Sequence, residues 1–344
     1  MRAAVLHAPG NFGLTEVPTP TPGPDEVLLR VEATTLCGTD LRLISGAKTA
    51  GVRPGVVLGH EIAGRIEVVG EGVDGYPVGA QATVSIVVSC HRCRECLANR
   101  EHFCENLELI GYAIDGGLAD YLLVPARAVA GGNVILTPEM PARTLCLAEP
   151  LSCVLNGASQ FNTQPGDTVV VLGAGPIGLL HTQLARLQGA SNVIVTNRSA
   201  QRRALALGLG ATHAVDPTSE DVAAVVGEVT NGRGADVVIV AIGALDLANQ
   251  ALQLAGTGGR VNYFAGFPKG STAVMDPNLI HYKELLVTGG SNARRADVHR
   301  AVQVLASGAI TADKIVTHAF NLDDVCQAIT AVDQKLGVKV CVEP

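Results

Sequence analysis

The sequence contains no tryptophan, and aromatic residues make up only 3% of its 344 residues. The hydrophobic core must therefore be built mainly from Val, Leu, Ile and Ala side chains. Charged residues are also scarce, at 17%, whereas hydrophobic residues reach 47%. This composition excludes a disordered chain, which needs low hydrophobicity and high charge. The length predicts two domains of ordinary size, each able to bury a core.

Basic runs and long hydrophobic runs are both missing. The formal net charge is −7, so the chain lacks the electrostatic footprint of a nucleic-acid-binding protein. Apolar stretches such as Val169–Leu172 and Val237–Ile242 have the length of strands and are too short to span a bilayer. No apolar segment follows a basic head at the start, so we expect no signal peptide and a cytoplasmic location. In that reducing compartment, clustered cysteines indicate metal binding.

The first part of the chain, to about residue 145, has the pattern of a β-rich domain. Short apolar stretches alternate with turn segments rich in proline and glycine, such as Pro18–Pro24. We predict strands at Ala3–Leu6, Glu26–Ala33, Gly64–Val69 and Ala82–Val88.

Four cysteines follow in a C-x2-C-x2-C-x7-C array, within a lobe of about residues 89–105. They are Cys90, Cys93, Cys96 and Cys104. This arrangement can wrap one tetrahedral Zn²⁺, because the short gaps let the backbone turn around the metal. An iron–sulfur cluster also takes four thiolates, but its usual spacings differ. Four sulfur ligands leave no open position, so we predict a structural zinc site and not a reaction centre.

A glycine-rich loop marks a change of pattern after about residue 165. The loop comprises Gly173, Gly175, Pro176, Ile177 and Gly178. It matches G-x-G-x-x-G and lies between the strand-like Thr168–Leu172 and the helix-like Leu179–Leu187, which is the context of a dinucleotide-binding fingerprint. The first glycine permits a tight turn, the second lets backbone approach the pyrophosphate, and the third lets helix and strand pack closely. The helix N-terminus then faces the phosphates.

Further strand and helix patterns alternate after this loop, which predicts an α/β domain with a doubly wound parallel sheet over residues 151–290. The predicted elements are Asn192–Asn197, Arg202–Leu209, His213–Asp216, Val222–Val229, Asp236–Ile242, Ala248–Leu254, Arg260–Ala265 and Glu284–Thr288. Residues 291–344 lack nucleotide signals and are expected to fold back onto residues 1–150. In this tail, Asp323 precedes an apolar periodic run and is a candidate helix N-cap.

The end of the second predicted strand indicates which cofactor binds. An NAD site usually has a carboxylate there for the ribose hydroxyls, but this chain has Asn197 followed by Arg198. Asn197 removes the charge that would repel a 2′-phosphate, and Arg198 can form paired hydrogen bonds with one. Arg202 and Arg203 follow one turn later, where they equally fit a solvated helix face. We therefore predict NADP(H) in preference to NAD(H).

Four residues from three separate segments have the chemistry of a catalytic zinc site. Cys37, His60, Glu61 and Glu149 offer sulfur, nitrogen and oxygen donors, and each segment contains a glycine or proline that turns the backbone. Zn²⁺ accepts all three donor types, and catalytic sites keep one position open. Spacing alone does not prove convergence, because an isolated Cys or His in an apolar run is more often a core residue.

Taken together, these motifs resemble the zinc-dependent medium-chain dehydrogenases, in particular the polyol (sorbitol) and threonine dehydrogenase branch. C-G-T-D at 37–40, G-H-E at 59–61, the cysteine array, A-E-P-L-S at 148–152 and the glycine loop follow the family's order over essentially the whole chain. The resemblance implies a GroES-like catalytic domain, a Rossmann cofactor domain and two Zn²⁺ ions per subunit. It places Cys37, His60 and Glu61 at the catalytic zinc, with Glu149 as a direct ligand or bound through water.

The resemblance also assigns roles around the metal. Thr39 stands where the family's hydroxyl passes the alcohol proton onward. Arg42 occupies the place where many relatives have a histidine ending that relay, and an arginine cannot act as a base at neutral pH. The proton is then expected to leave through cofactor ribose or water, and Arg42 is a candidate for binding a cofactor phosphate or an anionic substrate group. Lys339 matches a position near the cofactor pyrophosphate, or is an ordinary surface lysine.

The predicted function is interconversion of a secondary alcohol, of polyol, sugar or cyclitol type, and a ketone by hydride transfer with NADP(H). Alternatives are an NAD-dependent threonine-type or simple alcohol dehydrogenase, and a cofactor-binding structural or regulatory relative without activity. The expected partner is a small-molecule substrate, with no nucleic acid and no membrane. The resemblance implies a homodimer or homotetramer paired through an edge strand near Glu284–Gly289.

Overall fold

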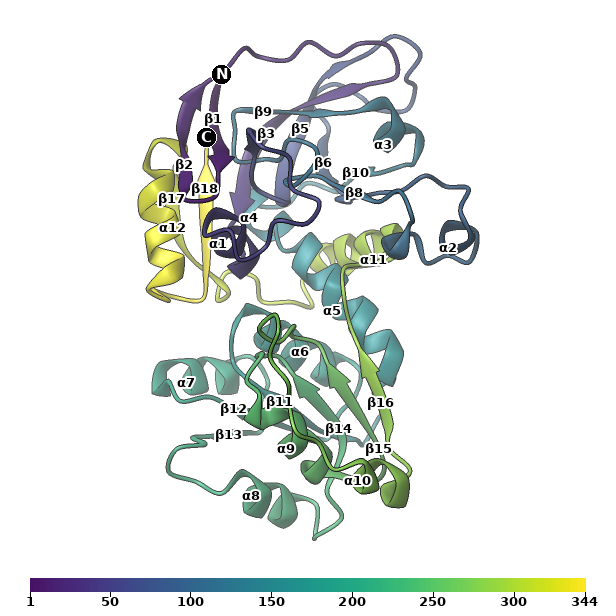
Figure 1. The fold of residues 1–344 in the computed structure, drawn as a ribbon, viewed down its shortest axis with the longest axis vertical. Coiled ribbons are helices and arrows are strands. Elements are labelled where there is room, and N and C mark those ends of the chain that lie inside the picture. The colour runs from purple at the N-terminus through teal and green to yellow at the C-terminus, as the bar shows by residue number, and fades with distance from the viewer. The chain divides into compact units, whose positions relative to one another are not determined.

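The computed structural model describes residues 1–344, and the chain forms two compact units. The first comprises Met1–Ser152, Asn292–Gly308 and Ala312–Pro344, and the second comprises Cys153–Ser291 and Ala309–Thr311. Both chain ends belong to the first unit, coloured purple and yellow in Figure 1, whereas the second unit is teal and green. None of the helices combines the length and apolar character that a membrane crossing requires.

The first unit is rich in β-structure, as its sequence predicts. Its strands are β1 (Arg2–Ala8), β2 (Asn11–Glu16), β3 (Val27–Thr35), β4 (Val56–Val57), β5 (Glu61–Val69), β6 (Gln81–Val84), β7 (Val87–Val88), β8 (Glu108–Leu109), β9 (Tyr121–Val124), β10 (Val134–Leu136), β17 (Val316–Asn321) and β18 (Lys339–Glu343). Its helical segments are α1 (Gly38–Ile44), α2 (Arg94–Leu97), η1 (Glu101–Phe103), α3 (Ala126–Ala130), α4 (Ala142–Leu145), α11 (Arg295–Ala306), η2 (Leu322–Asp324) and α12 (Val325–Asp333). Helix α5 (Ala148–Phe161) begins in this unit and ends in the second.

Strand β3 organises the largest sheet of the first unit, which has the order β10-β6-β5-β3-β18-β17 with β9 also paired to β3. The C-terminal strand β18 runs antiparallel to β3, with Cys341 opposite Thr35. Thr35 is in turn opposite Glu61 at the start of β5. The tail therefore pairs with the first unit and brings the end of the chain beside the G-H-E segment.

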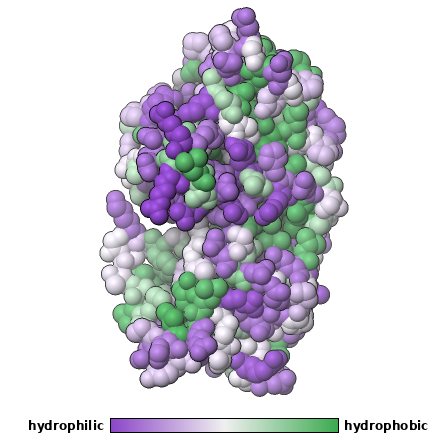
Figure 2. Space-filling model, turned by 90° about the vertical axis from the view of Figure 1, so that its right-hand side faces the viewer, coloured by the Kyte–Doolittle hydropathy of each residue, from purple (hydrophilic) through white to green (hydrophobic).

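Aliphatic side chains fill the core of this unit, as the lack of aromatics requires. Leu29 and Ile66 belong to a cluster beneath the large sheet, and both are fully buried. Leu58, two residues before His60, packs in a second cluster with Val340 of the tail. Burial of one leucine side chain contributes about 1.5–3 kcal/mol, so these clusters hold the segments around His60 in place. On the face shown in Figure 2, hydrophobic groups are interspersed with hydrophilic ones.

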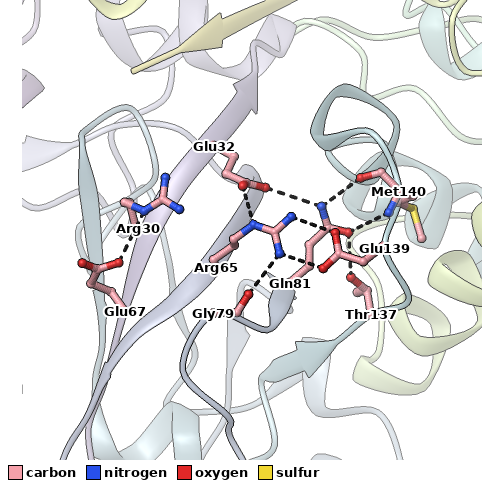
Figure 3. A network of polar contacts seen from close by, with 9 residues as sticks. All are labelled: Arg30, Glu32, Arg65, Glu67, Gly79, Gln81, Thr137, Glu139 and Met140. Atoms are coloured by element: carbon pink, nitrogen blue, oxygen red, sulfur yellow. Dashed lines mark hydrogen bonds and ion pairs between the residues drawn. The ribbon is translucent and has the colours of Figure 1, made fainter.

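A polar network anchors the chain segment that leads to α4 and α5 (Figure 3). Arg65 on β5 binds Glu32 on β3 at 2.6 Å and both carboxylate oxygens of Glu139 at 2.7 Å. Gln81 on β6 donates to the carbonyl of Met140 at 2.8 Å. The loop before α4 is thus fixed to three adjacent strands, which in turn fixes where α5 begins.

Two sequence predictions in this unit are wrong in detail. The strand predicted at Ala82–Val88 is interrupted, because Asn133 Nδ2 donates to the carbonyls of Ser85 and Val87 and takes them out of a continuous ladder. Asp323 does not cap a helix but forms an ion pair with Arg2 at 3.1 Å. A long-range cation there competes successfully with the local capping role.

The second unit is a doubly wound α/β fold. Its strands are β11 (Thr168–Leu172), β12 (Asn192–Thr196), β13 (His213–Val215), β14 (Ala235–Val240), β15 (Ala255–Tyr263) and β16 (Leu286–Gly289), and its helices are α6 (Pro176–Leu187), α7 (Ala200–Gly208), α8 (Val222–Val229), α9 (Asp246–Leu254) and α10 (Pro277–Lys283). All strand pairs are parallel, in the order β13-β12-β11-β14-β15-β16. This is the Rossmann order, so the predicted fold of this half is confirmed.

Candidate active site

Three of the predicted metal ligands converge in the first unit. One donor atom from each of Cys37, His60 and Glu61 lies within 4.8 Å of the others. Cys37 is the N-cap of α1, two residues after β3, and Glu61 opens β5. Gly59 has a φ of +92°, and a Cβ there would lie 2.7 Å from the backbone nitrogen of Leu118, so only glycine permits this turn.

Asp40 supports two of these ligands. Its side chain is fully buried, Oδ2 accepts the backbone N–H of Cys37 at 2.8 Å, and Oδ1 lies 3.3 Å from Nδ1 of His60. The geometry of this Oδ1···Nδ1 contact departs from that of a hydrogen bond, and neither of the two atoms has another hydrogen-bond partner. Burial tends to raise the pKa of Asp40, but the charge of His60 and the Cys37 N–H lower it overall. Asp40 thus directs Nδ1 of His60 toward itself and leaves Nε2 for a metal.

Glu61 forms a buried ion pair with Lys339. Lys339 Nζ lies 2.5 Å from Oε1 of Glu61, and the two side chains are 4% and 1% exposed. The Thr35 hydroxyl donates to Oε2, so both carboxylate oxygens have partners. Burial alone would lower the pKa of Lys339, but Glu61 and Cys37 raise it overall, so the amine is charged. Lys339 is therefore not the surface lysine that was one of the two sequence expectations, and its contact with a cofactor remains a prediction.

Glu149 lies in the first turn of α5 and is half-buried, but it is not a member of the converging group. It lines a small depression together with Ser85, Ser152 and Asn292. Burial raises the pKa of Tyr112, and the charge of Glu149 adds to that rise, which places Glu149 near the His60 side of the site.

Two cationic residues lie beside the C-G-T-D segment. Arg42 Nη2 donates to Oγ1 of Thr39 at 2.9 Å. Lys48 Nζ lies 4.5 Å from the centroid of the Tyr112 ring, and that ring lies 5.4 Å from the ring of His60. Thr39 itself is buried, at 9% exposure.

The residues of this site fit a zinc ion. Thiolate, imidazole and carboxylate donors converge from two segments, and the buried carboxylate of Asp40 lies 3.3 Å from Nδ1 of His60, on the side where metal-bound histidines usually have an acceptor. Cys37 and His60 are the direct ligands that this geometry favours, because the oxygens of Glu61 are occupied by Lys339 and Thr35. Fewer than four protein ligands leave a position for an alcohol oxygen.

The four cysteines of the lobe also come together. One sulfur from each of Cys90, Cys93, Cys96 and Cys104 lies within 4.8 Å of the others. The Cys93 sulfur is 3.4 Å from that of Cys96 and 3.9 Å from that of Cys104, close to the ~3.8 Å that tetrahedral Zn–S bonds of ~2.3 Å require. Backbone N–H groups lower the pKa of Cys90 to about 6. The group fits a closed structural zinc site.

The glycine loop of the second unit has the geometry that its sequence predicts. Gly173 has a φ of +110°, which suits the tight turn after β11. Gly175 is the N-cap of α6, with Pro176 in the first turn, and a Cβ on Gly175 would meet nothing within 4 Å. A Cβ on Gly178 would lie 1.8 Å from the carbonyl oxygen of Gly173. The loop is therefore open at its second glycine, where phosphates would approach, and closed at its third.

The segment after β12 has no carboxylate of its own. Asn197 Oδ1 accepts the N–H of Ser199 at 2.9 Å, and Ser199 caps α7. Arg203 is not a solvated cation: it binds Asp216 at 2.8 Å and the carbonyls of Asn197 and Arg198. The Arg198 side chain is exposed and has no carboxylate partner.

Arg202 is half-buried, and burial lowers its pKa. Ile177 lies in the first turn of α6, which is the position that the fingerprint predicts.

Sequence reasoning missed four residues of these sites: Thr35, Lys48, Tyr112 and Asp216. Thr35 could have been found from strand pairing, since it ends the strand just before Cys37. Tyr112 and Lys48 carry no local signal, because a loop tyrosine and an isolated lysine are common on any surface.

Comparisons with known proteins agree with this geometry. The family model for the alcohol dehydrogenase GroES-like domain matches residues 23–133, and that for zinc-binding dehydrogenases matches residues 176–307. The first unit therefore has the GroES-like fold that the resemblance implied, beside the Rossmann fold of the second.

Relatives extend the match over nearly the whole chain. L-threonine 3-dehydrogenase of Pyrococcus furiosus is 35% identical over 92% of this chain and 91% of its own length. Sorbitol dehydrogenase of Halalkalibacterium halodurans is 31% identical over 98% and 97%. A crystal structure from Sinorhizobium meliloti 1021, described as a zinc-binding dehydrogenase bound to NADP, superposes with a TM-score of 0.94 at 37% identity, covering 100% and 99% of the two chains. The chain belongs to the zinc-dependent medium-chain dehydrogenases and is an oxidoreductase of the alcohol dehydrogenase type.

Proposed function

We propose that the enzyme interconverts a secondary alcohol of polyol, sugar or cyclitol type and a ketone, with NADP(H) as hydride carrier. The observation that supports this most strongly is the convergence of Cys37, His60 and Glu61 beside the buried hydroxyl of Thr39. A thiolate and an imidazole that can hold zinc, next to a hydroxyl that can accept a proton, suit the deprotonation of a zinc-bound alcohol.

The chain's own residues prepare the site for a metal-assisted reaction. Zinc held by Cys37 and His60 would act as a Lewis acid that lowers the pKa of the alcohol. Asp40 fixes the orientation of both ligands through the Cys37 N–H and the imidazole Nδ1. The Lys339–Glu61 pair keeps a buried carboxylate neutralised next to the ligands. Holding the carbinol carbon in contact with the nicotinamide would convert a two-body encounter into a unimolecular step, worth up to about 7–11 kcal/mol.

Thr39 is the residue that receives the alcohol proton. Its Oγ1 already accepts one hydrogen bond from Arg42, so one lone pair remains for the substrate hydroxyl. As the substrate proton arrives, the Thr39 proton has to leave toward another acceptor. Arg42 cannot take it, because guanidinium stays protonated. The proton therefore passes to water or to a cofactor ribose hydroxyl.

The preference for NADP(H) rests on the segment after β12. Asn197 offers no charge against a 2′-phosphate, and the exposed Arg198 has no carboxylate partner in the chain. Asp216, the nearest acid on the next strand, is held by Arg203. The presence of NADP in the structure of the Sinorhizobium meliloti relative supports the same choice.

A threonine-type, NAD-dependent dehydrogenase is the second candidate, because several relatives carry that name. A cofactor-absorbance assay of the zinc-loaded enzyme across polyols, sugars, cyclitols and L-threonine, each with NADP⁺ and NAD⁺, separates the two. We expect turnover of a secondary alcohol with a higher kcat/KM for NADP⁺. Turnover confined to L-threonine and NAD⁺ would refute the proposal.

The cofactor preference has its own test. Asn197→Asp combined with Arg198→Ala restores a carboxylate and removes the phosphate-binding cation, so preference should move toward NAD⁺. Arg233→Ala, which removes an exposed cation of the same unit, is the matched control and should leave the ratio of the two kcat/KM values unchanged. Unchanged selectivity in the double variant would show that another part of the chain determines which cofactor ribose, with or without the 2′-phosphate, is bound.

We also propose that copies of the chain pair through β16, an edge strand of the parallel sheet with Leu286 51% exposed. An exposed edge with an apolar side chain favours association. Sedimentation should show a dimer or tetramer, and Leu286→Lys should lower the fraction of the chain that is oligomeric.

A further inference from the structure

The region beside Thr39 holds two cations that no acidic side chain neutralises. Arg42 contacts the Thr39 hydroxyl, and Lys48 lies over the ring of Tyr112. The structure records no carboxylate within ion-pair distance of either one. Two cations elsewhere in the same unit illustrate the paired state: Arg53 is paired with Asp115 and Arg65 with Glu32.

The anions close to these cations have other partners. Asp40 is fully buried against His60 and the Cys37 N–H. Glu61 is held by Lys339. The thiolate of Cys37 lies within electrostatic reach of Lys48 but is a metal ligand, so zinc would compensate its charge. With the site loaded, positive charge therefore exceeds negative charge around Thr39.

Both cations belong to one short stretch that bends around the site. Arg42 lies in the last turn of α1, and the backbone N–H of Lys48 donates to the carbonyl of Arg42 at 3.0 Å. Lys48 is half-buried, and its ammonium faces Tyr112, whose ring lies against the ligand His60. One cation thus reaches the proton-accepting hydroxyl and the other reaches the aromatic wall next to the ligand.

We propose that Arg42 and Lys48 form an anion subsite and that the substrate alcohol carries a carboxylate or a phosphate group close to its carbinol carbon. This proposal rests on the proposed function, of which it specifies the substrate class. The planar fork of Arg42 suits either anion, and Lys48 adds a point charge. Lys48 is half-buried without a counterion and therefore gains most from an anion that arrives with the ligand, whereas Arg42 is exposed and contributes its paired N–H donors. The proposal also explains why position 42 holds an arginine and not a proton-relaying histidine: Arg42 binds the anionic group of the substrate.

The pyrophosphate of the cofactor is the other source of an anion with this chemistry. The two sources predict different effects when the cations are removed. A substrate subsite affects KM for the anionic alcohol and leaves cofactor affinity unchanged. A cofactor subsite affects the Kd of NADPH and NADH and leaves discrimination between substrates unchanged.

The kinetic test uses matched alcohols: hydroxycarboxylates against their carboxamides, and sugar phosphates against the free sugars. Arg42→Met and Lys48→Met, separately and together, should each lower kcat/KM for the anionic member by about tenfold or more, the usual loss of a charge-assisted hydrogen bond. The neutral member should lose less than the anionic one in every variant. Because Arg42 also donates to the Thr39 hydroxyl, the readout is the ratio of the two kcat/KM values and not the rate with either alcohol alone. Arg30→Met with Lys335→Met, which removes an arginine and a lysine exposed elsewhere in the unit, is the matched control.

The binding test needs no turnover. Calorimetric titration of the zinc-loaded enzyme, saturated with NADP⁺ so that the phosphate sites of the cofactor are filled, with inorganic phosphate should show binding that the Arg42→Met/Lys48→Met variant loses and the control variant keeps. Nicotinamide fluorescence should give the same Kd of NADPH for all variants. Weaker NADPH binding with unchanged substrate discrimination would assign the cations to the cofactor and overturn the proposal. Equal phosphate binding by wild type and double variant would overturn it as well.

These outcomes are distinct from failure of the proposed function. An enzyme that oxidises no alcohol of the panel but loses phosphate binding in the double variant would retain the anion subsite and lose the proposed reaction. An enzyme that prefers neutral alcohols and shows no loss in the double variant would retain the reaction and lose the subsite.

Discussion

Replacement of Asp40 by asparagine tests how the chain positions its metal ligands. The carboxylate of Asp40 accepts the Cys37 N–H at 2.8 Å and lies 3.3 Å from Nδ1 of His60. An asparagine side chain offers one acceptor and one donor. In either orientation, one of the two partners would therefore face an N–H group in a fully buried site.

The expected loss follows from this mismatch. Leaving a buried polar group unsatisfied costs about 1–3 kcal/mol, which corresponds to about 5- to 150-fold in metal affinity. The upper part of this range applies, because Asp40 also supplies a charge that lies next to His60. Loss of such a supporting carboxylate typically weakens metal binding or activity by about 10- to 100-fold. We expect Asp40→Asn to fold, to bind NADPH normally and to lose catalytic zinc.

The assay is competition with a chelator, following zinc at the two proposed sites separately. The ion of the four-cysteine lobe is the internal reference and should be released at the wild-type rate. Asp120→Asn is the matched control, because Asp120 also accepts a backbone N–H and pairs with a cation, in both cases from Arg2. Wild-type zinc retention and wild-type kcat/KM in Asp40→Asn would refute the positioning role.

Three further predictions concern the cofactor loop, a buried histidine and a buried ion pair. Gly178→Ala should raise the Kd of NADPH by about 10-fold or more, which a fluorescence titration measures. The reason is that the added Cβ would lie 1.8 Å from the Gly173 carbonyl oxygen and displace the loop. Burial lowers the pKa of His181 from 6.5 to about 3. The free energy of unfolding should therefore fall as the pH drops below 6.5, by about 2 kcal/mol at pH 5. Urea unfolding measures this loss, and His181→Leu should remove it. Lys339→Met should destabilise the chain by about 3–5 kcal/mol in the same assay, and adding Glu61→Gln should restore most of it.

Each of these predictions has a control. Gly175→Ala adds a Cβ into open space, so it should leave the cofactor-free fold unchanged even where it weakens NADPH binding. His281→Leu removes an exposed histidine from the same unit, and its stability should depend on pH as in the wild type. The account of the loop would be contradicted by tighter or unchanged NADPH binding in Gly178→Ala. The account of the histidine would be contradicted if His181→Leu lost as much stability at low pH as the wild type. The account of the ion pair would be contradicted if adding Glu61→Gln to Lys339→Met restored no stability.

Motifs with short spacing were fully readable from the sequence. The glycine loop and the four-cysteine array depend on neighbours within a few residues, and both have the predicted geometry. The alternation of strands and helices fixed the Rossmann half in the same way. Aliphatic strands at β11, β12 and β14 are buried on both faces, which gives an unambiguous pattern.

The start of α5 was missed for a local reason. Pro150 follows Glu149 and indicates a break, but it lies in the first helical turn, where a missing N–H costs nothing. Glu149 was therefore identified by type and family motif, and its place on a helix came only from the structure.

The remaining contacts of the site depend on tertiary register. Lys339 and Glu61 are separated by 278 positions and meet because β18 pairs with β3, and β3 with β5. No periodicity in either segment contains that information. Lys48 and Tyr112 likewise meet only when their loops pack together. Sequence reasoning found residues whose type is unusual and missed those whose partner makes them functional.

Anomalous diffraction at the zinc edge, from crystals of purified active enzyme with NADP(H), tests the central claim most directly. We predict two zinc peaks per chain, one among the four cysteines and one about 2.0–2.3 Å from both the Cys37 sulfur and a His60 ring nitrogen. An active crystal with no peak at Cys37 and His60 would contradict the account.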